Sequence, residues 1–180
     1  GILVSGAGER ESASGKRVVI IGGGDAAFEN ALILREFAES VTVVHRRSEF
    51  SARREFVEPV LADAAINVIT AYIPVSINGT EEVESVTLEN VNTGKQVDLE
   101  TDLVLIRIGV VPNSELVAGQ VDKDSLGYVR VDGESRTSAA GVWAIGDVAN
   151  PTAPTIATAV GMGATAAKSA LKLINSRKKL

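Results

Sequence analysis

The sequence of 180 residues contains no cysteine and only one histidine. Without cysteine the chain forms neither a disulfide nor a thiol-based redox centre, so any redox chemistry requires a bound cofactor. Zinc and other transition-metal sites draw mainly on cysteine and histidine ligands. The composition therefore predicts no metal site.

Long hydrophobic runs and an excess of positive charge are also missing. No stretch approaches the roughly 20 apolar residues that cross a bilayer, and the opening residues lack the basic lead of a signal peptide. The net charge of −5 argues against a nucleic-acid-binding surface. We therefore expect a cytoplasmic protein that binds neither a membrane nor nucleic acid.

A glycine turn directly follows the apolar run Val18–Ile21, and a helix-length segment follows the turn. A buried strand, a glycine turn and a helix together direct backbone N–H groups and the positive end of the helix dipole at a diphosphate. Gly22 permits the tight turn, and Gly24 lets the phosphate approach the backbone. The pattern predicts a dinucleotide site at Gly22, Gly23, Gly24, Asp25, Ala26 and Ala27.

His45, Arg46 and Arg47 stand where an NAD site would place an Asp or Glu that binds the ribose 2′-hydroxyl. Guanidinium groups bind a 2′-phosphate, which a carboxylate would repel. Residues 46–54 hold four of the chain's 18 lysines and arginines. These features predict NADPH rather than NADH. The competing interpretation is a solvated basic helix face, and His45 either contacts the ribose or is solvated.

The periodicity predicts an α/β fold with three layers, a Rossmann-like dinucleotide-binding domain that carries an inserted antiparallel meander. Residues 1–15 are expected to be an irregular connector. The expected strands are 17–21, 41–44, 67–70 and 103–106, with helices over 25–38 and 52–64 and the meander over 72–99. Pro59 is expected to kink or split the second helix. After Pro112 we expect strands at 128–131 and 142–145 and a helix over 155–175.

Four segments together resemble the thioredoxin reductase type of flavin-dependent pyridine nucleotide oxidoreductases. They are Gly22–Ala27, His45–Arg47 followed by Phe50, Ile108–Asn113 and Gly141–Val148. The resemblance implies an FAD domain split around an NADPH domain. It assigns 1–13 to a connector, 14–109 to the NADPH-binding domain, and 110–180 to the C-terminal half of a partial FAD-binding domain.

The resemblance also implies further cofactor-binding residues. Gly109 lies in the motif Ile108–Asn113, which follows the last strand of the first domain. Asp147, beside Gly146, would accept a hydrogen bond from the flavin ribityl chain. The start of the last helix would face the flavin ring, where its dipole favours the reduced flavin. The implied residues are Gly109, Gly146, Asp147, Thr155, Ile156 and Ala157.

Two departures from this family are visible. Only 21 residues precede Gly22, so the first FAD motif is missing and the flavin site is half present; FAD binding needs a missing N-terminal segment or a separate chain. The Cys-x-x-Cys pair of members that reduce thioredoxin falls on Ser5-Gly6-Ala7-Gly8, which cannot relay electrons through a disulfide. Some flavoproteins of this build lack the pair and reduce another acceptor.

The sequence thus supports a portion of an NADPH-dependent flavin oxidoreductase that passes hydride from NADPH to FAD and on to an unknown acceptor. Nicotinamide and flavin carry the electrons, so no catalytic acid or base is assigned. The alternative is a non-catalytic NADP(H)-binding module or a subunit that pairs with a separate flavin-binding chain. A homodimer stays open.

Overall fold

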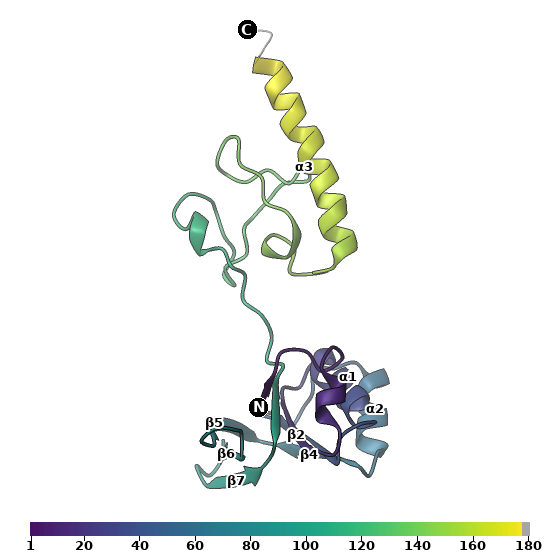
Figure 1. Cartoon of the computed structure of the whole chain (residues 1–180). Helices are drawn as coiled ribbons and strands as arrows, with labels where there is room; N and C mark the ends of the chain where they lie inside the picture. Colours follow the sequence, from purple (N-terminus) through teal and green to yellow (C-terminus); the bar gives the residue numbers. More distant parts are fainter. Residues whose placement is uncertain (178–180) are drawn as a thin grey trace. The chain divides into compact units, whose positions relative to one another are not determined.

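Runs of aliphatic residues form the parallel strands of one sheet in the computed structural model, which describes residues 1–177. The sheet lies in the first of two units, Gly1–Gly109; the second unit begins at Val110. The strand order of this sheet is β1-β8-β2-β3-β4. Figure 1 shows its strands β2 and β4 together with the helices α1 (Asp25–Leu34) and α2 (Arg54–Ala62) of the same unit. The strands are β1 (Ile2–Leu3), β2 (Arg17–Ile21), β3 (Ser40–His45), β4 (Ile66–Thr70) and β8 (Leu103–Ile106).

Alternation along the strands creates two apolar faces, because successive side chains of a strand point to opposite sides. On one face, Val18 and Ile20 pack in a buried cluster with Phe28 and Leu34 of α1 and with Val60 of α2. On the other face, Val19 and Ile21 pack with Val86 and Leu88. The sheet is therefore covered on both sides, as near-continuous apolar strands require.

The second covering layer is the predicted antiparallel meander. Its strands are β5 (Tyr72–Asn78), β6 (Ser85–Asn90) and β7 (Gln96–Glu100), in the order β5-β6-β7. Only Ala71, in the left-handed region at φ 62°, separates β4 from β5, so the chain turns sharply from one sheet into the other. The predicted three-layer α/β architecture is confirmed.

Three boundaries in this unit differ from the predictions. Helix α1 ends at Leu34, and the chain turns through residues 35–39. Helix α2 spans Arg54–Ala62 without being split, because Pro59 lies on its exposed side and removes a single intrahelical bond. The connector contains β1, whose residues pair in parallel with Val104 and Leu105 of β8. The sequence did not predict β1, because a strand of two residues is too short to show a hydrophobic period.

In the second unit the predicted strands at 128–131 and 142–145 are wrong. Each region makes one isolated antiparallel bridge, Lys123 to Val129 and Arg136 to Trp143. A strand needs a neighbour along its length to form a ladder, and the described residues of this unit supply none. The regular elements are the short 3₁₀ helices η2 (Glu115–Val117) and η3 (Gly146–Val148) and the long helix α3 (Ile156–Arg177).

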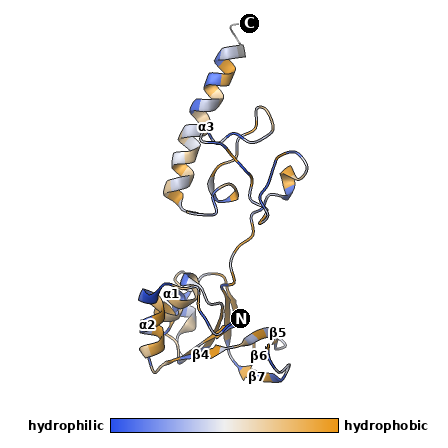
Figure 2. Cartoon of the chain, turned by 180° about the vertical axis from the view of Figure 1, so that it is seen from behind, coloured by the Kyte–Doolittle hydropathy of each residue, from blue (hydrophilic) through white to orange (hydrophobic). Residues whose placement is uncertain are grey.

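Helix α3 carries hydrophobic residues along its length, and its strongly hydrophilic residues lie in its C-terminal half (Figure 2). Several of its apolar side chains are exposed, with Ile156 at 85% and Val160 at 67%. Neither α3 nor another helix within residues 1–177 combines the length and hydrophobicity that a bilayer-spanning helix needs.

Candidate functional site

The predicted glycine turn connects the end of β2 to the start of α1. The Gly22 N–H donates to the Val44 carbonyl oxygen at 3.0 Å, and its φ of 154° lies in the region that favours glycine. A Cβ at this position would stand 2.2 Å from the Arg107 carbonyl oxygen and 3.1 Å from the Ala27 Cβ. Gly22 therefore lets β2, β8 and the buried start of α1 meet.

Gly23 and Gly24 continue the turn for different reasons. A Cβ at Gly23 would lie 2.3 Å from Nδ1 of His45, so the imidazole packs directly on this backbone. Gly24 is the extended N-cap of α1, and its carbonyl oxygen accepts the N–H of Ala27 at 3.0 Å. A Cβ there would meet only Ser51 Oγ, at 3.5 Å. The space in front of Gly24 is thus open to a ligand.

The N-terminus of α1 supplies donors at this turn. The first N–H groups of an α-helix have no intrahelical partner, and those of Asp25 and Ala26 find no acceptor in the part of the chain that the structure describes. Ala26 is exposed, whereas Ala27 is fully buried under the turn. The arrangement is the expected one for an anion-binding helix terminus.

The Asp25 carboxylate is held by Arg53. The Arg53 N–H donates to Oδ1 and its Nε–H to Oδ2, both at 2.7 Å. These two hydrogen bonds lower the pKa of Asp25 below its usual range. Arg54 pairs in turn with Glu58, at 2.6 Å. Two of the four clustered arginines therefore serve local ion pairs.

Arg46 and Arg47 follow β3 and are exposed. Neither side chain makes an ion pair or a hydrogen bond within residues 1–177. The half-buried His45 before them lies with Nε2 3.1 Å from the Glu49 carbonyl oxygen. Burial, reinforced by the charges of Arg46 and Arg47, lowers the pKa of His45, so the ring is neutral at pH 7. The charge at this loop therefore comes from the arginines.

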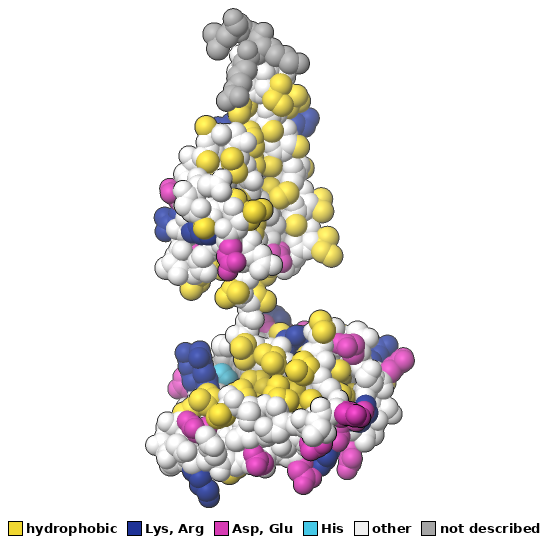
Figure 3. Space-filling model, turned by 60° about the vertical axis from the view of Figure 1, so that its left-hand side comes forward, with side chains coloured by type: hydrophobic (Ala, Val, Ile, Leu, Met, Phe, Trp, Pro, Cys, Tyr) yellow, Lys and Arg dark blue, Asp and Glu magenta, His cyan; other side chains and the backbone are white. Residues whose placement is uncertain are grey.

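These segments line one cleft of about 550 Å³ within the first unit. The structure brings together the three glycines, His45, Arg46, Arg47 and Gly109, which the sequence assigned to the cofactor site. Asp25, Ala26 and Ala27 are not among the residues that line the cleft; they form the first turn of α1, directly after Gly24, which lines it. Figure 3 shows hydrophobic side chains gathered on one face of this unit, with positively charged side chains on one side of them and negatively charged ones on the other.

Sequence reasoning missed the apolar wall of the cleft. This wall comes largely from β5, with additions from the strand ends and from the loop after β8; its residues are Ile21, Val44, Tyr72, Ile73, Pro74, Ile77, Ile106 and Ile108. Glu49, Ser51 and Arg107 also line the cleft. The feature of the sequence that could have indicated this wall is that β5 follows β4 almost directly. The first residues of β5 therefore lie beside the carboxyl ends of the parallel strands.

In the second unit, Gly146 and Asp147 lie on η3, and Gly146 packs on α3. Gly146 has φ 70°, and a Cβ there would stand 3.5 Å from the Ala159 Cβ. Thr155 precedes α3, and its Oγ1 accepts the N–H of Thr158 at 3.3 Å. Asp147, Thr155, Ile156 and Ala157 are exposed. One unit therefore carries all five residues that the resemblance assigned to flavin.

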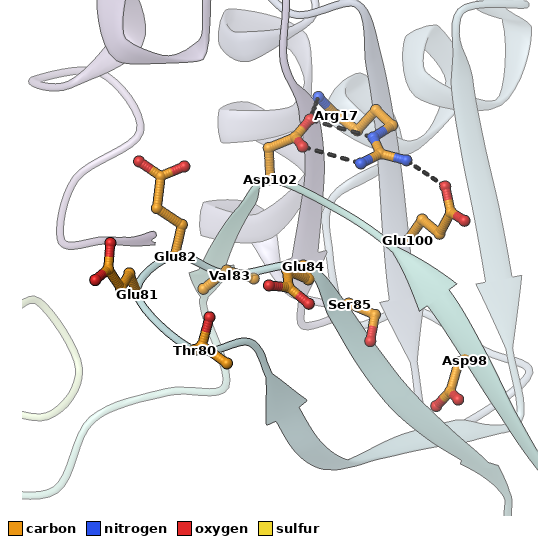
Figure 4. A pocket seen from close by; sticks show the side chains of 10 residues that line it. All are labelled: Arg17, Thr80, Glu81, Glu82, Val83, Glu84, Ser85, Asp98, Glu100 and Asp102. Atoms are coloured by element: carbon orange, nitrogen blue, oxygen red, sulfur yellow. Dashed lines mark hydrogen bonds and ion pairs between the residues drawn. The ribbon is translucent and has the colours of Figure 1, made fainter.

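A second, shallow cavity lies at the amino end of β2, opposite the glycine turn (Figure 4). There the Arg17 guanidinium donates to Asp102 Oδ1 at 2.9 Å and to Glu100 Oε2 at 2.5 Å. These contacts tie β2 to the β7–β8 connection. The surrounding carboxylates form no group of three metal ligands, and neither does any other part of residues 1–177. At this cavity Arg17 thus forms ion pairs with both Glu100 and Asp102.

The ion pair between Arg17 and Asp102 gives a pH-dependent prediction. Hydrogen bonds from the Arg17 side chain and N–H hold the pKa of Asp102 at about 2. Because the folded-state pKa is lowered, the stabilisation is complete above the unfolded-state pKa near 4 and is lost as the pH falls towards 2. We expect Asp102→Asn to lower the free energy of unfolding by about 1 kcal/mol at pH 7, since the pair is partly exposed.

Urea unfolding of both proteins at pH 7, 4 and 3 measures this difference. It should narrow as the pH falls; a difference that stays constant would exclude Asp102 as the titrating group.

The chain is similar to known proteins over the segments that carry these motifs. The family model for pyridine nucleotide-disulphide oxidoreductases matches residues 4–163. The chain is 41% identical over 150 residues to the thioredoxin reductase of Mycolicibacterium smegmatis, covering 83% of this chain and 48% of that protein. It is 40% identical over 151 residues to that of Streptomyces coelicolor, covering 83% and 47%.

Solved structures agree with this result. The crystal structure of Lactococcus lactis thioredoxin reductase matches with a TM-score of 0.86 and 32% identity, over 98% of this chain and 58% of that chain. This chain therefore spans about half the length of the relatives it matches. The resemblance predicted from the motifs is confirmed. The chain belongs to the pyridine nucleotide-disulphide oxidoreductase family.

Proposed function

We propose that the chain is the NADPH-binding portion of a flavin-dependent oxidoreductase of the thioredoxin reductase type. The observation that carries this proposal is the position of Arg46 and Arg47. They lie on the same cleft as the glycine turn, and the described residues give them no anionic partner. Two guanidinium groups without a partner beside a diphosphate-binding turn suit a coenzyme with an additional phosphate.

Each part of this coenzyme would contact a different group of residues in the cleft. The turn Gly22–Gly24 and the N–H groups of Asp25 and Ala26 would bind the diphosphate. Arg46 and Arg47 would bind the 2′-phosphate, with neutral His45 beside the ribose. The apolar side chains of β5, above all Ile73 and Ile77, would exclude water from a planar ring of the coenzyme.

The second unit is proposed to contribute to a flavin site. Its residues fit such a group, because exposed Asp147 offers a hydrogen-bond acceptor and the exposed start of α3 offers backbone donors. When both cofactors are bound, nicotinamide supplies a hydride and flavin accepts it. The protein's share is to orient the two groups and to exclude water. A relay through residues 5–8 is excluded, because Ser5 and Gly8 have no thiol.

A fluorescence titration of the chain with NADPH and NADH, with absorbance recorded at the flavin bands, tests this function. We expect NADPH to bind more tightly than NADH and added FAD to bind weakly until the remaining part of the flavin site is supplied. Tighter binding of NADH, or binding of neither, would contradict the proposal. Coenzyme binding without any flavin binding, even with a flavin-binding partner chain, would favour the non-catalytic module instead.

A further inference from the structure

The ion pair between Asp25 and Arg53 lies at the first turn of α1, beside the proposed diphosphate site. Both carboxylate oxygens of Asp25 accept a hydrogen bond from Arg53, each at 2.7 Å. The Arg53 guanidinium also pairs with Glu55, at 2.8 Å, and lies 4.9 Å from the centre of the Phe56 ring. The arginine is thus fixed in one place, although 60% of its side chain is exposed.

Asp25 is the first residue of α1, next to Gly24. A negative charge there interacts favourably with the helix dipole, but it competes with a bound anion for the same positive end of the helix. An unpaired Asp25 carboxylate would therefore repel a diphosphate at Gly22–Gly24. Pairing with Arg53 cancels this charge within the first turn.

We propose that Arg53 is a positioning residue that acts through Asp25, keeping the N-terminus of α1 receptive to the coenzyme diphosphate. This inference rests on the proposed function. It assigns different tasks to neighbouring arginines: Arg46 and Arg47 select the 2′-phosphate, whereas Arg53 supports binding of the diphosphate. Because NADPH and NADH share the diphosphate, loss of Arg53 weakens both to the same extent.

The loop that carries Arg53 is held by bonds that do not involve its guanidinium group. The Gly23 carbonyl oxygen accepts the N–H of Ser51 at 2.9 Å, the N–H of Ala52 at 3.1 Å and the hydroxyl of Ser51 at 3.2 Å. The main-chain N–H of Arg53 itself contacts Asp25. Removing the guanidinium group therefore changes the charge at the helix terminus and leaves the loop in place.

The test compares three variants of the full chain by calorimetric titration with NADPH and NADH. Arg53→Gln removes the guanidinium group and keeps most of the aliphatic stem. Arg54→Gln is the matched control, because the neighbouring arginine carries the same charge but pairs with Glu58. Asp25→Asn combined with Arg53→Gln removes both charges of the pair. Circular dichroism checks that each variant is folded.

We expect Arg53→Gln to raise the Kd of both coenzymes about fivefold, a size typical of charges at helix termini. Arg54→Gln should stay within about twofold of the unchanged chain, and the double variant should return to that range. Equal effects of Arg53→Gln and Arg54→Gln, or no recovery in the double variant, would overturn the role proposed for Arg53 and leave the proposed function standing. Failure of the unchanged chain to bind either coenzyme would overturn the proposed function as well.

Discussion

Replacing Arg46 and Arg47 together with alanine is expected to weaken NADPH binding about 100-fold and to leave NADH binding within about twofold. Each arginine would lose a charge-assisted hydrogen bond to the 2′-phosphate, which contributes about 1.5–3 kcal/mol. Two such losses, reduced by the exposure of both side chains, amount to about 3 kcal/mol. NADH has no 2′-phosphate, so its affinity depends on the glycine turn and the apolar wall.

Parallel fluorescence titrations of the two coenzymes measure this effect. A double variant at Arg54 and Lys95 removes the same number of positive charges from exposed positions outside the cleft. It should keep the preference for NADPH. If the ratio of the two affinities does not change in the Arg46 and Arg47 variant, the assignment of the 2′-phosphate site is wrong.

Gly22→Ala is expected to lower the free energy of unfolding by about 2–3 kcal/mol and to abolish measurable coenzyme binding. The new Cβ would lie 2.2 Å from the Arg107 carbonyl oxygen, at a φ of 154°. The contacted Arg107 atoms belong to the main chain, so relief requires a shift of β2 against the end of β8, and overpacking of this kind costs about 1–3 kcal/mol. Alanine at a φ of 154° also strains the backbone, which lowers the free energy of unfolding further.

Gly24→Ala is the matched comparison for Gly22→Ala. Its Cβ would make an ordinary contact with Ser51 Oγ at 3.5 Å, so the free energy of unfolding should fall by no more than about 1 kcal/mol. The methyl group would occupy the space through which the diphosphate approaches, and the Kd of both coenzymes should rise more than tenfold. Urea unfolding followed by circular dichroism, together with the titrations, separates the two effects. Equal stability of both variants would contradict the close packing at Gly22.

The first unit was predictable because its signals are local and strong. The apolar run before Gly22, the glycine turn and the return at residues 41–44 each place an element within a few residues of its observed bounds. The same regularity placed Arg46 and Arg47 beside the turn, since the carboxyl ends of neighbouring parallel strands lie at one edge of a sheet.

Other features of the site depend on contacts between distant segments. The apolar wall from Ile73 and Ile77 exists because Ala71 turns the chain into the second sheet, which no periodicity reveals. The pairing of Arg53 with Asp25 joins residues 28 positions apart. The sequence places Arg46 at the end of a strand, but nothing in it shows that Arg53 pairs with Asp25.

The second unit was less predictable for a different physical reason. Residues 128–131 and 142–145 have the β-branched and aromatic composition of strands, but composition describes a side chain's preference for a half-buried sheet surface. Whether a strand forms depends on a neighbour that completes its hydrogen bonds, and in this unit each segment finds a single bridge.

The proposed function requires that one cleft binds the diphosphate at Gly22–Gly24 and the 2′-phosphate at Arg46 and Arg47. A crystal structure of the chain with bound NADP⁺ tests it most directly. We expect density for the diphosphate within hydrogen-bond distance of the backbone N–H groups at the glycine turn and for the 2′-phosphate against both guanidinium groups. Coenzyme bound at any other surface, or a 2′-phosphate in solvent away from both arginines, would contradict the proposed function.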